Sequence, residues 1–145
     1  MSVISAVVDL ATNGVSAEAE ALRELIGNEP TRIISDCWQG EEPLFPYVIL
    51  GELQASVTEQ ARAGGRVNRV EQVLISFTVF GDDRASVESV IQAIDDLYMT
   101  KEPGHLTSGS FTHMCTTFGN RFSSLDSDTR IWRGQLELLF KITKV

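Results

Sequence analysis

The segment VEQVLISFTVFGDDRASVESVIQAIDDLY, residues 70–98, places an alternating strand pattern directly before an amphipathic helix pattern. One face of the strand collects apolar side chains with a period of two: Val73, Ile75, Phe77 and Val79. Past Asp82 and Asp83, apolar residues return at helical spacing: Val87, Val90, Ile91, Ile94, Leu97 and Tyr98. A strand and a helix that are each apolar on one side predict a sheet that is covered by helices.

The neighbouring carboxyl groups of Asp82 and Asp83 stand where this helix begins. Two carboxylates can hold a hard cation, but at a helix start they more often cap free main-chain N–H groups and complement the helix dipole. We therefore interpret the pair as a helix cap.

A second strand pattern precedes this segment. FPYVILGELQASV, residues 45–57, has apolar residues on both faces, which is typical of a strand that is partly buried on each face. We predict that strands 45–57 and 69–80 pair as an antiparallel hairpin with a tip at 58–70. The tip gathers three cations around a flexible pair: Arg62, Arg66, Arg69, Gly64 and Gly65. A solvated loop and a partner-docking loop that orders on binding both fit this composition.

The remaining patterns complete one domain, residues 1–145. Helical spacing covers 3–12 and 16–26. Strands are expected within 31–38, 110–118 and 131–145, with a long polar connection over 119–130. The predicted class is α+β: an antiparallel β-sheet with helices packed on one face and a long β-hairpin tip loop.

The composition is acidic. The chain of 145 residues has a formal net charge of -8, which disfavours binding to a phosphate backbone because that affinity depends on Lys and Arg. No export signal and no apolar run of about 18 residues occur, which predicts synthesis in the cytoplasm and no membrane partner. Cys37 and Cys115 lie far apart without CxxC spacing, so neither a disulfide framework nor a zinc signature is indicated.

His113 and Cys115 have the residue types of a nucleophilic dyad. Two positions apart on a strand, they are expected to project from the same face about 7 Å apart, without the close approach that a dyad needs. A metal site would also need His105 and Cys37, and no spacing supports one. The common nucleotide, phosphate and hydrolase motifs are absent from the sequence. We therefore predict no catalytic residue, no metal and no cofactor.

Four stretches resemble one protein family: LIGNEPTRI, FPYVILGE, the strand and helix at 70–98, and RIWRGQLELLFKIT. They are similar to the tail terminator or tail-completion proteins of long-tailed phages, prophages and gene transfer agents, in element order over nearly the whole chain. The resemblance implies an antiparallel sheet with helices on one side and a structural, non-enzymatic role. In that family, six copies form a ring that caps the tail tube, stops its growth and presents a head–tail joining surface.

The resemblance also implies partners and a location. The expected partners are further copies of the chain in a hexameric ring, the tail tube protein and the head–tail connector protein. DNA passes through the lumen without specific binding, and an acidic subunit suits this passage because it repels phosphate. The implied location is the tail or neck of the virion, after assembly in the host cytoplasm.

Two segments are candidates for binding these partners. The tip at 58–70 matches the tip loop of the family, with Arg62, Arg66 and Arg69 as the expected contacts beside Gly64-Gly65. The connection at 119–130, with Arg121 and Arg130, is the second candidate. Two alternatives stay open: another neck, tail-tube or head-completion subunit, and a dimeric α+β domain that binds a small molecule or is an enzyme.

Overall fold

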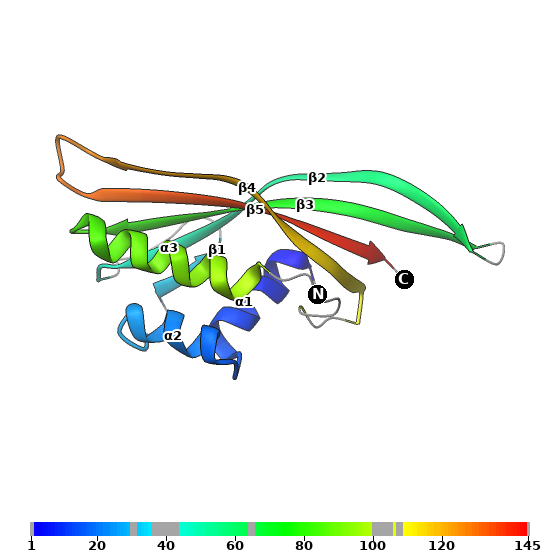
Figure 1. Cartoon of the computed structure of the whole chain (residues 1–145), viewed down its shortest axis with the longest axis horizontal. Coiled ribbons are helices and arrows are strands. Elements are labelled where there is room, and N and C mark those ends of the chain that lie inside the picture. Colours follow the sequence, from blue (N-terminus) through cyan, green and yellow to red (C-terminus); the bar gives the residue numbers. More distant parts are fainter. Residues whose placement is uncertain are drawn as a thin grey trace.

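The computed structural model describes residues 2–29, 32–35, 44–63, 66–99, 106 and 109–144, with the backbone alone at 35, 54–63, 66–69 and 144. In these residues the strands form one sheet in the order β1-β2-β3-β5-β4 (Figure 1). The elements are α1 Val3–Asn13, α2 Ala17–Leu25, β1 Ile33–Ser35, β2 Tyr47–Ala63, β3 Arg66–Gly81, α3 Arg84–Tyr98, β4 Phe111–Leu125 and β5 Trp132–Lys144.

The helices lie together on one face of the sheet (Figure 1). α3 packs on β3 and β5, α1 packs on β1 and β2, and α2 packs against both α1 and α3. This arrangement confirms the predicted α+β class with helices on the sheet. Of the helices described, none is both long enough and apolar enough to cross a membrane.

The core lies between α3 and the central strands. The register of β3 and β5 places Phe77 opposite Leu136 and Ile75 opposite Leu138, and all four side chains are buried. The same face continues onto β2, where buried Leu50 lies opposite Phe77. Each such side chain stabilises the fold by about 1.5–3 kcal/mol relative to an exposed position.

Tyr98 connects α3 to the strands and to α1. Its ring centroid lies 5.3 Å from that of Phe77 and 5.8 Å from that of Phe140. Its hydroxyl donates a hydrogen bond to the main-chain carbonyl of Val7 in α1. Burial raises the pKa of Tyr98 far above its ordinary value, so the hydroxyl keeps its proton and remains a donor.

Asp83 caps α3, as the sequence predicts for the acidic pair. Its carboxylate accepts hydrogen bonds of 2.8 Å from the main-chain N–H and from the hydroxyl of Ser86. The bond from the Ser86 N–H, followed by that from its hydroxyl, lowers the pKa of Asp83 below 3.8. The start of α3 is therefore fixed directly after β3 ends.

The sheet is mixed rather than wholly antiparallel. β1 runs parallel to β2, with Ile33 opposite Val48 and Ser35 opposite Leu50. A strand of 3 residues has the same alternation in either direction, so its sequence pattern does not reveal which way it runs.

Two predicted connections are strands instead. β2 and β3 continue to pair as far as Ala63 opposite Arg66, across most of the expected tip at 58–70. β4 likewise continues into the expected connection at 119–130, as far as Leu125 opposite Trp132. In β4 the side chains from Thr117 to Leu125 are exposed or half-buried, and a strand without a buried face needs no alternation in its sequence.

Gly134 allows α3 to lie close to β5. An added Cβ at this position would lie 2.2 Å from Ile91 Cδ1 and 2.6 Å from Val87 Cγ1. Gly81 on β3 has a similar role, since an added Cβ there would lie 2.7 Å from Val87 Cγ2. The first half of α3 therefore packs on the backbone of two neighbouring strands.

Gly134→Ala is expected to lower the free energy of unfolding by about 1–3 kcal/mol, because the added methyl group overlaps two buried side chains. Urea unfolding followed by circular dichroism measures this change. Gly51→Ala on β2 is the matched control, since a Cβ there would lie 3.5 Å from Ser76 Oγ. The control is expected to shift stability by less than about 1 kcal/mol. Wild-type stability of Gly134→Ala would contradict the close packing.

Candidate partner-binding surfaces

Two hairpins extend from the sheet toward opposite ends of the molecule (Figure 1). The ends of β2 and β3 form one, called here the β2–β3 arm, residues 59–63 and 66–70. The ends of β4 and β5 form the other, called the β4–β5 arm, residues 119–134. The structure therefore separates the two groups of arginines that the sequence proposes as binding residues.

The β2–β3 arm carries the first group. Arg62 lies opposite Val67 and Arg66 lies opposite Ala63, in a two-stranded part of the sheet. Arg69 lies at the base of the arm, where β5 joins with Lys144 opposite it. Of the predicted tip, Gly64 and Gly65 lie outside the described residues. In its described residues, the basic segment is thus a pair of strands.

A turn at residues 126–131 closes the β4–β5 arm. Asp126 Oδ1 accepts hydrogen bonds from the main-chain N–H groups of Asp128, at 2.9 Å, and Thr129, at 3.4 Å. Those two bonds lower the pKa of Asp126 below 3.8. Arg130 follows with φ of 58°, in the left-handed region, and its side chain is exposed. Arg130 therefore sits on a shaped turn rather than on a long loop.

Arg121 is held against α3, contrary to its predicted place on a loop. It lies on β4 opposite Leu136, on the face that the helices cover. Its guanidinium donates a 3.0 Å hydrogen bond to Gln92 Oε1, and Gln92 donates one of 2.9 Å to Asp96. Burial and the charge of Asp96 raise the pKa of Asp95, while Arg121 partly offsets this rise.

The exposed apolar side chains of β4 are a feature that the sequence analysis missed. Phe118 is 55% exposed, Phe122 is 44% exposed and Leu125 is 45% exposed. A shallow groove beside them is lined by Glu88, Ile91, Arg121, Phe122 and Ser123. The signal was present in the sequence as apolar residues within an otherwise polar connection.

His113 and Cys115 do not form a dyad, and their predicted position on one face is wrong. The β4 register shifts between them, so His113 lies opposite buried Ile142 while Cys115 lies opposite Lys141 on the other face. His113 is buried and its Nε2 lies 2.9 Å from Thr116 Oγ1. A β-bulge reverses the alternation of a strand, and sequence spacing alone does not show where a bulge falls.

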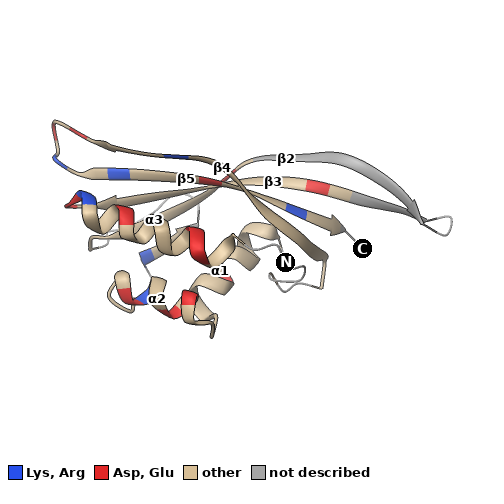
Figure 2. Ribbon diagram, viewed as in Figure 1, with Lys and Arg blue, Asp and Glu red and all other residues tan. Residues whose placement is uncertain are grey.

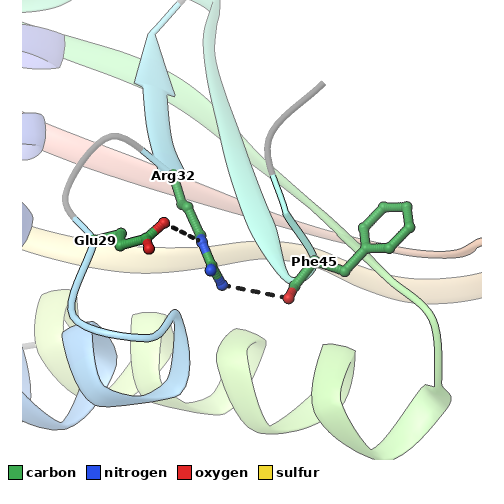
Figure 3. A network of polar contacts seen from close by, with 3 residues as sticks. All are labelled: Glu29, Arg32 and Phe45. Atoms are coloured by element: carbon green, nitrogen blue, oxygen red, sulfur yellow. Dashed lines mark hydrogen bonds and ion pairs between the residues drawn. The ribbon is translucent and has the colours of Figure 1, made fainter. Parts of the chain in front are cut away.

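The buried guanidinium of Arg32 holds the start of β2 near the end of α2 (Figure 3). Its Nε donates a 2.9 Å hydrogen bond to Glu29 Oε2, and its NH1 donates one of 3.3 Å to the carbonyl of Phe45. Gly27, at φ of 73°, lies directly under the guanidinium. These partners satisfy the charge internally, so the role of Arg32 is structural.

In the part of the chain that is described, no three His, Cys, Asp or Glu side chains gather as a metal site would require. Cys37 and His105, which the sequence analysis considered for such a site, lie outside it.

Comparison with known proteins identifies a similar fold. No protein-family model and no curated protein matches the sequence. Among solved structures, the chain is similar to one chain of the virion of a native gene transfer agent particle, with a TM-score of 0.63 and 18% sequence identity. The match covers 97% of this chain and 94% of that chain.

The turn of the β4–β5 arm is expected to loosen in acid. Because the pKa of Asp126 is lowered, its stabilising contribution is present above the ordinary value of 3.8 and is lost as pH falls through the lower folded-state value. NMR shifts of the Asp128 and Thr129 amides should report a midpoint below 3.8. Asp126→Asn keeps an acceptor oxygen without the titration and is expected to remove that transition. A wild-type midpoint at or above 3.8 would contradict the hydrogen bonds.

Proposed function

We propose that the chain is the tail terminator of a phage or gene transfer agent particle. In this role it forms a ring on the end of the tail tube, stops tube growth and provides the surface that joins the head. The observation that carries the proposal is the shared fold with a virion chain over nearly the full length of both proteins. The resemblance of four sequence stretches to tail terminators supports the same role.

The shape of the subunit suits contacts in two directions. The sheet and its helices form a compact middle, and the two arms extend beyond the helices at opposite ends (Figure 1). Neighbouring copies can therefore meet along the sheet while an arm reaches the tube or the connector. Under this proposal the β2–β3 arm, with Arg62 and Arg66 beyond the end of β5, contacts an acidic partner.

The distribution of charge is compatible with the passage of DNA. Acidic residues are spread over the helices, and the basic residues coloured on β4 and β5 lie apart from one another (Figure 2). With a net charge of -8, a ring of such subunits repels phosphate as a whole. DNA would then cross the lumen without specific binding.

The proposal assigns no catalytic residue and no cofactor. The pair on which an enzymatic role would depend, His113 and Cys115, lies on opposite faces of β4. The strongest alternative remains another subunit of the particle, such as a tube or head-completion protein, which would share the plan of a sheet with helices. A tube subunit polymerises into long cylinders, whereas a terminator stops at a closed ring.

Deletion of the chain from cells that produce the particle tests the proposal. Electron microscopy is expected to show overlong tail tubes without attached heads, since nothing ends tube growth. Expression of the wild-type chain from a plasmid should restore normal tails. Tails of normal length after deletion would overturn the proposal, and a complete loss of tubes would instead assign the chain to the tube itself.

The double variant Arg62→Glu and Arg66→Glu tests the β2–β3 arm. Both residues lie in the two-stranded part of the sheet, so we expect a normal thermal unfolding temperature together with failure to cap tubes in the complementation assay. Arg62→Lys with Arg66→Lys is the matched control, because it changes the same two positions and keeps both positive charges. Equal capping by the two variants would rule out a specific role for the arm.

A further inference from the structure

The sheet has a long open edge on each side. β1 pairs only with Val48–Leu50, and no other described strand pairs with the outer edge of β2 from Gly51 to Ala63. On the opposite side β4 is outermost, and its outer edge has no partner strand among the described residues along Phe111–Leu125. Each edge presents main-chain N–H and C=O groups that a further strand can pair with.

The directions of these two edge strands are complementary. β2 is antiparallel to β3, β3 to β5 and β5 to β4, so β2 and β4 run in opposite directions. A second copy placed beside the first in the same orientation therefore brings its β2 antiparallel to β4 of the first. Such a contact joins two different surfaces, and contacts of this kind close into a ring when the rotation between successive copies returns to the first copy.

Exposed apolar side chains flank the β4 edge on both faces. Phe118 lies opposite Leu138 on the face that the helices cover, and Phe122 lies opposite Gln135 on the other face. A strand added to this edge would cover both aromatic rings at once, whereas a partner docked on one face would cover one. Aromatic side chains that become buried on association supply much of the binding energy of an interface.

The edge of β2 offers matching features. Its first two residues past Gly51 are exposed: Glu52, and Leu53 with 53% exposure. Because β1 occupies the edge up to Leu50, the end of β4 at Leu125 can reach as far as Gly51 of a second copy. That limit places exposed Leu125 near exposed Leu53 and lets β4 run along the whole free part of β2.

We infer that β4 of one copy pairs antiparallel with the free part of β2, Gly51–Ala63, of the next copy, and that this pairing builds a continuous sheet around the assembly. The inference rests on the proposed function in one respect, that the chain acts as a closed ring. It adds which surfaces meet: main-chain hydrogen bonds along the two edges, with Phe118, Phe122 and Leu125 covered by the neighbouring strand.

Site-specific photocrosslinking in assembled particles tests the pairing. Phe118→p-benzoylphenylalanine places the reactive group beside the β4 edge, and irradiation is expected to give a covalent dimer. Mass spectrometry should locate the crosslink within residues 51–63 of the second copy. The same replacement at Val15, which is 91% exposed between α1 and α2, is the control and should give no crosslink to that segment.

Three results would overturn the inference: a crosslink from β4 to β4, crosslinks only to another protein, or the absence of a dimer. If the Phe118 variant does not assemble, the reactive group is placed at Leu125 and the same outcomes apply. Tail length in the wild-type and deletion strains is scored separately. If tubes are capped normally and no dimer forms, the inference is wrong and the proposed function stands. If a dimer forms and deletion leaves the tails normal, the proposed function is wrong and the inference stands.

Discussion

The contact between α3 and the backbone of β3 and β5 is the constraint on which the rest of the structure depends. Because Gly81 and Gly134 have no Cβ, the side chains of Val87 and Ile91 lie in the space that a Cβ would occupy. This approach buries the alternating apolar faces of both strands under one helix. It also sets how far burial extends, because the strands are longer than the helix that covers them.

Outside the core that the helices cover, the strands continue to pair through main-chain hydrogen bonds. The β4–β5 arm shows the result most clearly, since its β4 residues from Thr117 onward are exposed or half-buried. Its polar contacts include those of Asp126 within the turn and the hydrogen bond from Arg121 to Gln92 of α3. The middle of the domain thus presents two extended hairpins, which are the surfaces that we propose for contacts with other proteins.

The sequence was sufficient to predict the elements whose buried residues recur with a regular period. The strand around Ile75, the helix from Arg84 to Tyr98 and the Asp83 cap were all predicted, because each depends on local spacing. The lengths of the two arms were not predicted, since strands can continue to pair through their main chains without an alternating sequence pattern. The separation of His113 from Cys115 depends on one β-bulge, and the position of Arg121 depends on pairing across the sheet, so neither could be obtained from local patterns.

The two opposite open edges have a consequence for how copies would be counted. A molecule that pairs through one edge still exposes the other, so strand pairing between copies does not saturate at two. If copies join in this way, addition ends only when the last molecule meets the first. The number of subunits would then be determined by the angle between successive sheets. That angle depends on the twist of the sheet within a single domain, so the twist would set the circumference.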